Sequence, residues 1–310
     1  MVAFKRFGWR HVELSVPEDW FLGTEGGTRG SGFFRLEDRY RPRLEITWQS
    51  IKFEKAPSTK KAFDGFIKNI EKRLSKAEAA ELKVVSREEV SICGHDGFLG
   101  RLRSGLWIAS AMTWYCEFSE KMFGALLTFS PSDPERELVE RRIVESLRCH
   151  FPADADVLWS LYGVEVELPA SFYLVKAHLT TGLSHAVFKH SSKNLHIAIA
   201  YSAMAHRLLK AKGGLSEIVN KDFRKQVVSS VRKFGRINVK KGEGGVYLLT
   251  ASTFDLLFGK VQLMGQAWIS TNDRMLIVSV IAPRKLAEEA ERLLHSTCEK
   301  LRQRAGLAIR

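Results

Sequence analysis

The sequence repeats itself at an offset of 148 to 154 residues, and this repeat constrains the fold more than any other feature. An alternating segment ending at Pro17 is followed three residues later by Trp20, and one ending at Pro169 by Phe172. Further matched pairs run along both halves: Gly30 and Gly182, Leu44 and Leu195, Gly94 and Gly242, Trp114 and Trp268, Cys149 and Cys298. Repeats of this length are duplicated domains rather than solenoid units.

Two domains also fit the chain length of 310 residues, since one domain takes about 150. We expect a first domain at residues 1–150, a linker at 151–156 and a second domain at 157–310. The low identity between the matched segments indicates an old duplication.

Each half shows the same order of elements: strands with period-two alternation, an amphipathic helix, a glycine hairpin, further strands and a closing helix. Strands are expected at about 11–16, 32–37, 43–52, 106–118 and 122–129, then at 164–168, 172–178, 184–189, 195–201, 261–270 and 275–281. Helices are expected at about 58–80, 133–149, 215–235 and 284–304. Ser58 and Ser216 are predicted N-caps, and the hairpins turn at Gly94–Gly97 and Gly242–Gly245.

This order predicts an α+β protein of two similar tandem domains, each an antiparallel sheet flanked by two main helices. The pattern resembles the PsbP-like fold, a group that includes a photosystem extrinsic protein and a nuclear import factor that binds the GTPase Ran. The resemblance rests on the segments Val16–Trp20 and Leu168–Phe172, the glycine hairpin and the closing helices with Ser146-Leu147 and Ser296-Thr297. It implies a binding or assembly role, not an enzyme, and carries over no functional residues.

Charge is distributed unevenly between the halves. The chain carries a formal net charge of +13, from 48 Lys and Arg against 35 Asp and Glu. Residues 156–310 hold 23 basic and 12 acidic side chains, whereas residues 1–155 hold 25 and 23. A one-sided excess of this kind points to a surface that faces an anionic partner.

The composition also indicates the source and the compartment. Only five Asn and five Gln occur, and depletion of heat-labile amides is typical of thermophile proteins. Four cysteines make no disulfide framework, so a cytoplasmic protein is expected. No apolar run is long enough to insert into a membrane as a helix, and the first ten residues lack the apolar core of a secretory signal.

The basic segment 206–241 is the main functional candidate. It holds eleven Lys and Arg against only Glu217 and Asp222, and so carries +9. On a regular helix of 3.6 residues per turn, five of its cations share one arc opposite Val219 and Phe223. These predicted contacts for an anionic partner are Lys221, Arg224, Lys225, Arg232 and Arg236. The partner is predicted to be nucleic acid or an acidic protein surface; the alternative is a solvated thermophile helix.

Other chemical candidates favour a structural interpretation. Glycines between Gly23 and Gly32 indicate a hairpin turn, because no helix follows to complete a phosphate loop. The histidines 178, 185, 190 and 196 are expected at exposed strand edges, with a zinc site as the alternative. Cys149 is expected to be a small buried residue, as is Cys298. Cys93 beside His95 is the one candidate nucleophile pair, and both are placed at a turn.

No catalytic, cofactor-binding or metal-binding residues are therefore predicted. The sequence favours a non-catalytic binding or assembly protein. Two alternatives stay open: an enzyme with an unmarked active site between the two domains, and a structural subunit of a larger complex that is held through the first domain.

Overall fold

The structure, a computed structural model, describes residues 2–74, 81–105, 107–161, 163–180, 182–270 and 272–304. The chain divides into two compact units, Met1–Pro152 (unit 1) and Ala153–Arg310 (unit 2). The division falls within residues 151–156, where the sequence predicts the linker.

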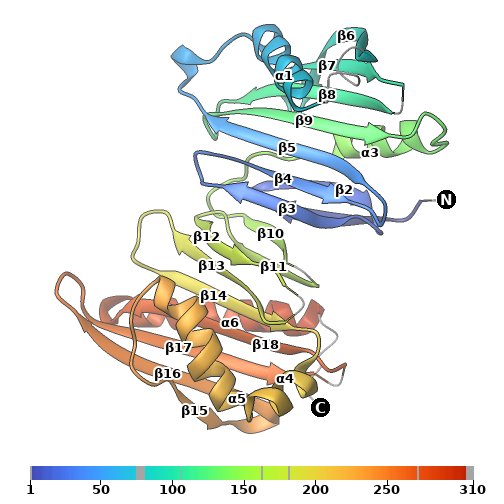
Figure 1. The fold of residues 1–310 in the computed structure, drawn as a ribbon. Helices are drawn as coiled ribbons and strands as arrows, with labels where there is room; N and C mark the ends of the chain where they lie inside the picture. The colour runs from blue at the N-terminus through green and yellow to red at the C-terminus, as the bar shows by residue number, and fades with distance from the viewer. Residues whose placement is uncertain are drawn as a thin grey trace. The chain divides into compact units, whose positions relative to one another are not determined.

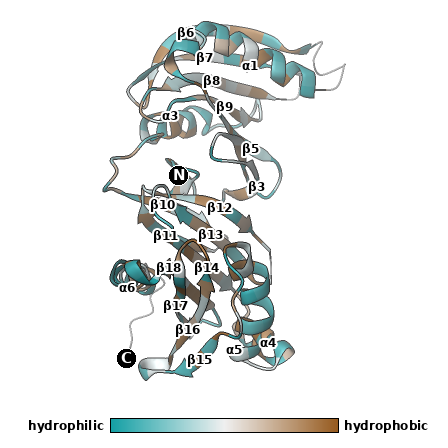
Figure 2. Cartoon of the chain, turned by 90° about the vertical axis from the view of Figure 1, so that its left-hand side faces the viewer, coloured by the Kyte–Doolittle hydropathy of each residue, from teal (hydrophilic) through white to brown (hydrophobic). Residues whose placement is uncertain are grey.

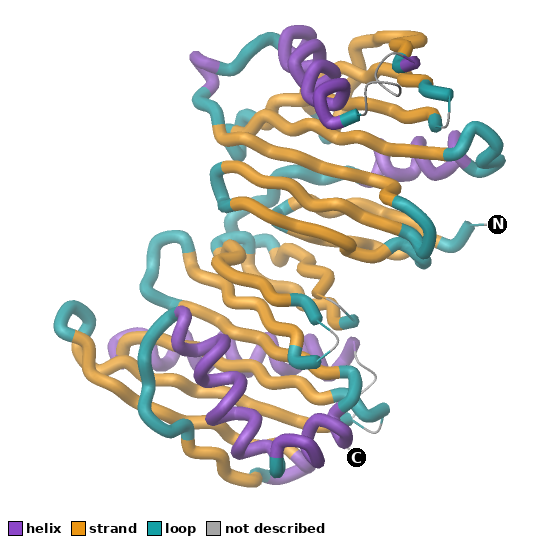
Figure 3. Tube along the Cα trace, viewed as in Figure 1, coloured by secondary structure: helices purple, strands orange, loops and turns teal. Residues whose placement is uncertain are grey.

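Unit 1 is built on a seven-stranded antiparallel sheet with the order β3-β4-β5-β9-β8-β7-β6, and β1 and β2 form a separate hairpin (Figure 3). Its strands are β1 (Phe4–Trp9), β2 (Val12–Pro17), β3 (Phe21–Gly27), β4 (Ser31–Glu37), β5 (Pro42–Ser50), β6 (Lys83–Ile92), β7 (His95–Arg103), β8 (Ile108–Cys116) and β9 (Lys121–Phe129). Its helices are η1 (Phe53–Lys55), α1 (Thr59–Arg73) and α3 (Arg136–Ser146).

Unit 2 has the same plan: a seven-stranded antiparallel sheet with the order β12-β13-β14-β18-β17-β16-β15 and a β10–β11 hairpin. Its strands are β10 (Asp156–Leu161), β11 (Val164–Pro169), β12 (Phe172–His178), β13 (Ser184–His190), β14 (His196–Ser202), β15 (Asn238–Lys241), β16 (Val246–Asp255), β17 (Gly259–Ile269) and β18 (Met275–Pro283). Its helical segments are α4 (Ala205–Lys212), α5 (Leu215–Glu217), η2 (Ile218–Val227), η3 (Val228–Ser230), η4 (Glu243–Gly245), η5 (Arg284–Leu286) and α6 (Ala287–Arg304).

The two sheets match strand for strand, which confirms the predicted pair of similar α+β domains (Figure 1). The match extends to an irregularity. In unit 1 the β3–β4 register shifts between Leu22 and Thr24, and in unit 2 the β12–β13 register shifts between Leu174 and Lys176. A bulge adds one residue to a strand and bends it, so the same bend is built into the same strand of both copies.

Helices cover both faces of the sheet in unit 1. Ala109 and Ala111 of β8 belong to the apolar cluster around Phe63 of α1. Ser110 between them donates a hydrogen bond of 2.9 Å to Glu140 of α3. Because successive strand residues point to opposite faces, α1 and α3 lie on opposite sides of the sheet (Figure 1).

Unit 2 has the same three layers. Leu263 and Ala267 of β17 pack in the cluster that holds Phe223 of η2. Gln266 on the other face accepts a hydrogen bond of 2.7 Å from Arg302 of α6. The central strand β18 is buried along its whole length, and Figure 2 colours it and its neighbour β14 as hydrophobic. The core therefore lies on both faces of this sheet.

The predicted helix at 215–235 is the largest departure from the sequence analysis. Residues Ile218–Val227 form a π-helix, and the helical segments end at Ser230. A π-helix bonds residue i to i+5, so its side chains do not follow the 3.6-residue spacing. Ser216 is not an N-cap, since Gly214 takes that position before α5.

Other boundaries are closer to expectation. Ser58 caps α1 by accepting a hydrogen bond from the Lys61 amide. The helix predicted to reach residue 80 is α1, which ends at Arg73, and residues 75–80 lie outside the described residues. Among the described helices, none combines the length and the apolar composition needed to cross a membrane.

Candidate binding surface and side-chain clusters

The five cations predicted to face a partner take different positions. Arg224 donates hydrogen bonds of 3.1 Å each to the backbone carbonyls of Asn220 and Phe234. Lys221 pairs with Glu217 at 2.9 Å. Arg224 is therefore occupied within unit 2, and Lys221 keeps a neighbouring counter-charge.

One of the other three cations also makes contacts within unit 2. Arg232 pairs with Asp255 and lies over the Phe258 ring, with 5.9 Å between its Cζ and the ring centroid. Lys225 and Arg236 are exposed. Arg232 and Arg236 follow the last helical residue, so the single helical arc predicted for all five is wrong for these two.

Exposed cations remain numerous between residues 207 and 241 of unit 2. They come from α4, η2, the segment before β15 and β15 itself, and within the described part of the chain no ion pair joins them to an acidic side chain. These seven, called here the basic surface, are Arg207, Lys210, Lys225, Lys233, Arg236, Lys240 and Lys241. The basic surface thus holds seven unpaired cations, whereas the sequence analysis selected five. Only two of those five, Lys225 and Arg236, belong to it.

An apolar hairpin tip lies next to Arg232, which precedes Lys233 of the basic surface. Phe254, Leu256 and Leu257 at the β16–β17 turn are 73%, 96% and 86% exposed. Asp255 orders the turn by accepting hydrogen bonds of 2.9 Å from the Leu257 and Phe258 amides. The ion pair between Asp255 and Arg232 ties this tip to the segment that carries Lys233 and Arg236.

The four histidines of unit 2 are not all at exposed edges. His185 is only 3% exposed, which corrects the expectation for this residue. Its ring lies 5.4 Å from that of His178. Burial, followed by the charge of Lys176, lowers the pKa of His185 to about 4. Among the described residues, these histidines do not form a group of three or more potential metal ligands.

A cluster of cysteine and histidine side chains occurs instead in unit 1. The ligand atoms of four residues lie within 4.8 Å of one another, and we call them the Cys–His cluster: His95, Cys116, Cys149 and His150. His95 begins β7, Cys116 ends β8, and the other two follow α3. Cys149 and Cys298 are both buried, as expected, but only Cys149 has such neighbours.

The thiols of this cluster are poorly suited to nucleophilic catalysis. A hydrogen bond with Cys149 and burial raise the pKa of Cys116 to about 12. For Cys149, the hydrogen bond with Cys116 lowers the pKa, but the Cys93 thiol and burial outweigh it and raise the pKa to about 12. A reactive cysteine needs a lowered pKa, so these thiols stay protonated at neutral pH unless a cation binds them.

Unit 1 also contains a groove of about 860 Å³ between the β7–β8 strands and α3. Leu99, Phe129 and Val144 contribute apolar surface to it. Its buried acid, Glu140, is paired with Arg101 and accepts the hydrogen bond from Ser110. The groove therefore places a buried carboxylate beside a cavity, but that carboxylate already has partners.

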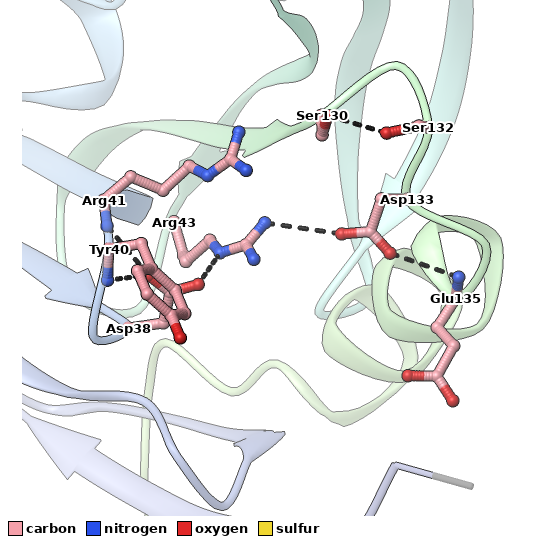
Figure 4. A network of polar contacts seen from close by, with 8 residues as sticks. All are labelled: Asp38, Tyr40, Arg41, Arg43, Ser130, Ser132, Asp133 and Glu135. Atoms are coloured by element: carbon pink, nitrogen blue, oxygen red, sulfur yellow. Dashed lines mark hydrogen bonds and ion pairs between the residues drawn. The ribbon is translucent and has the colours of Figure 1, made fainter.

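A polar network holds the β4–β5 turn to the loop before α3 (Figure 4). Asp38 accepts hydrogen bonds from the Tyr40 and Arg41 amides at 2.7 and 2.8 Å and from Arg43 Nε at 2.5 Å. Arg43 also reaches Asp133 at 3.4 Å. Burial raises the pKa of Asp38, but these hydrogen bonds outweigh it and the net shift is downward.

The glycine-rich stretch forms the predicted hairpin. Gly27 ends β3 with φ of +102°, a backbone conformation that glycine adopts without strain. Strand β4 follows, with no helix to complete an anion site.

Comparisons with known proteins give similarity in fold only. No family model matches the sequence. None of the curated proteins matches it. Among solved structures, PsbP of Synechocystis sp. PCC 6803 shares 13% identity over 48% of this chain and 94% of its own, with a TM-score of 0.37. PsbP is the protein after which the fold that the sequence pattern resembles is named.

Two further solved structures share similarly little sequence with this chain. Mog1 shares 12% identity over 44% of this chain and 84% of its own, with a TM-score of 0.25. The immunity protein TplEi of Pseudomonas aeruginosa, solved with a peptide, shares 10% identity over 96% of both chains, with a TM-score of 0.30. At these values the function of the chain has to be argued from its own residues.

Proposed function

We propose that the protein is a non-catalytic binding or assembly protein and that the basic surface of unit 2 binds an anionic partner. The observation that carries the proposal is the set of seven exposed Lys and Arg side chains between residues 207 and 241 that form no ion pair with an acidic side chain among the described residues. Clustered unpaired cations create a positive potential that attracts polyanions, and binding gains free energy from released counterions.

The hairpin tip favours an acidic protein over nucleic acid as this partner. Protein interfaces combine an apolar centre with a polar rim, and Phe254, Leu256 and Leu257 would supply that centre beside the cations. A phosphate backbone offers little surface that could bury three apolar side chains. Nucleic acid, the other predicted partner, becomes a competing outcome of the test.

Fluorescence anisotropy at low salt tests the proposal with three labelled probes: polyglutamate, an acidic peptide in which Leu and Phe alternate with Glu, and duplex DNA. Replacing Lys225, Lys233 and Arg236 by Ala should weaken all three. The matched control replaces Lys60, Lys61 and Lys68, which are exposed on α1 of unit 1, and should bind as the wild type does. Equal affinities for both triple variants would reject the basic surface.

The hairpin tip then separates the two kinds of partner. The double substitution Leu256→Ser and Leu257→Ser should weaken binding of the mixed acidic and apolar peptide several-fold and leave DNA binding unchanged. If the tip variant binds the mixed peptide as well as the wild type does, while DNA binds more tightly than either peptide, nucleic acid is the better assignment.

An enzyme remains the competing class. Within unit 1 its most suitable position is the groove beside Glu140, but the Arg101 and Ser110 contacts there are those of a structural ion pair. We therefore favour binding over catalysis.

A further inference from the structure

The distances in the Cys–His cluster of unit 1 match those between the ligands of a tetrahedral metal ion. His150 Nδ1 lies 3.2 Å from His95 Nε2, 3.6 Å from Cys116 Sγ and 3.7 Å from Cys149 Sγ. Zinc bonds of about 2.0–2.1 Å to nitrogen and 2.3 Å to sulfur, at tetrahedral angles, separate pairs of ligand atoms by about 3.3–3.8 Å. The three contacts of His150 thus have the spacing of ligands around one ion, and the remaining pairs of ligand atoms lie within 4.8 Å of one another.

The three contacts of His150 Nδ1 cannot all be hydrogen bonds at once. A neutral imidazole nitrogen is either one donor or one acceptor. His150 Nδ1 nevertheless faces three polar atoms, one from His95, one from Cys116 and one from Cys149. At most one of these contacts can be a good hydrogen bond, whereas a central cation would satisfy all four ligand atoms together.

The surroundings of the cluster also fit a bound thiolate. The buried indole N–H of Trp114 makes no hydrogen bond of good geometry, but its contact with the Cys149 side chain lowers the pKa of that thiol. A metal-bound sulfur carries negative charge and would be a stronger acceptor for this donor. Hydrogen bonds from outside the ligand shell of this kind are common around metal sites.

The Phe118 ring packs against the two histidines but leaves them partly accessible. The Phe118 ring stacks on His150 with 4.4 Å between centroids, and it lies 6.0 Å from the His95 ring. Cys116 and Cys149 are buried, and the two histidines are half-buried. The cluster is therefore shielded on the sulfur side and reached from the histidine side, through which an ion could enter.

We propose that His95, Cys116, Cys149 and His150 form a structural zinc site in unit 1. Two thiolates and two imidazoles in a tetrahedral arrangement select Zn²⁺ over harder cations, and four protein ligands leave no open position for catalysis. Binding releases the two thiol protons to solvent. The ion would tie the segment after α3 to the ends of β7 and β8, which adds a cross-link to the unit and is independent of the proposed function of unit 2.

The sequence analysis predicted no metal, so a measurement of the zinc content distinguishes the two expectations. The protein is purified without chelator and assayed for zinc by elemental analysis, then reloaded with Co²⁺ as a spectroscopic probe. We expect one equivalent of zinc per chain, and for Co²⁺ the visible bands of a tetrahedral site with thiolate-to-metal charge transfer. Cys149→Ala should lose the zinc, while Cys298→Ala, at the matching position of the repeat, should retain it.

Two variants keep the test independent of folding. His95 is half-buried at the start of a strand, so His95→Ala should fold. It should nevertheless bind zinc much more weakly than the wild type does. His150→Cys exchanges one ligand for another, so it should keep a four-ligand site and give a shifted Co²⁺ spectrum. The proposal is overturned if the wild type takes up neither metal, if zinc content is equal in Cys149→Ala and Cys298→Ala, or if thiol titration finds Cys116 and Cys149 joined as a disulfide.

Discussion

Arg224 donates a hydrogen bond of 3.1 Å from Nη1 to the backbone carbonyl of Phe234. Its Nε reaches the carbonyl of Asn220. Because the side chain of Asn220 in turn bonds the backbone of Ile237, the arginine belongs to a network that fixes the segment after the π-helix. A cation that the sequence places at a binding face thus has a structural role.

Arg224→Ala should therefore reduce stability rather than affinity. Hydrogen bonds from charged groups contribute about 1.5–3 kcal/mol, and we expect a loss of that order in the free energy of unfolding. The neighbouring Lys225→Ala should change stability by less than about 0.5 kcal/mol, because the lysine is exposed. Chemical denaturation of both variants checks this, and equal stabilities would contradict the structural role.

The buried His185 predicts a loss of stability on acidification. Its folded pKa is lowered to about 4 from the ordinary 6.5. Between these values the unfolded chain binds a proton that the folded chain does not, so stability rises with pH across this window and falls as pH drops from 6.5 towards 4. One such group contributes about 1.4 kcal/mol per pH unit.

His185→Phe isolates this contribution because phenylalanine fills similar space without titrating. The slope of unfolding free energy against pH should decrease by about one proton between the two pKa values. His196, whose pKa burial also lowers to about 4, continues to contribute in both proteins. Parallel pH profiles for wild type and variant would show that His185 is accessible to protons in the folded state.

The Asp38 network also predicts a loss of stability on acidification, but at lower pH. The folded pKa of Asp38 lies below the ordinary 3.8, so its stabilisation is fully present above that value and is lost as pH falls through the folded pKa. Asp38→Asn should cost about 1.5–3 kcal/mol at neutral pH, because Arg43 loses a charged acceptor. Thermal unfolding should show the two proteins converging in strong acid; a constant difference down to the lowest pH would contradict the ionised pair.

Much of the fold could be predicted from the sequence because matching segments in the two halves indicated the same strands and helices, although each segment alone was a weak indication. Strand β3 was nevertheless missed. Its sequence, Phe21–Gly27, is rich in glycine and shows no alternation, and it becomes a strand because β4 offers a ladder of backbone hydrogen bonds. Edge strands that are stabilised mainly by pairing leave little pattern in their own side chains.

The clusters were harder to predict because they depend on register. Gly97 of β7 pairs with Trp114 of β8, and the same register extended by two residues sets His95 opposite Cys116. Cys149 and His150 arrive only after the chain has completed α3. No local spacing joins these residues, so a sequence search for zinc motifs finds nothing. The π-helix likewise depends on tertiary packing around Phe223, which intrinsic propensity does not specify.

The salt dependence of binding tests the central claim, the basic surface, most directly. Duplex DNA is the suitable probe because its charge spacing is known, and each neutralised phosphate contributes about 0.9 to the log–log slope of affinity against salt. The account predicts that wild-type affinity falls steeply as salt rises, and that replacing Lys225, Lys233 and Arg236 by Ala flattens the slope by about 2–3 units. The α1 control variant should keep the wild-type slope. No measurable binding at low salt, or the same slope in all three proteins, would contradict the account.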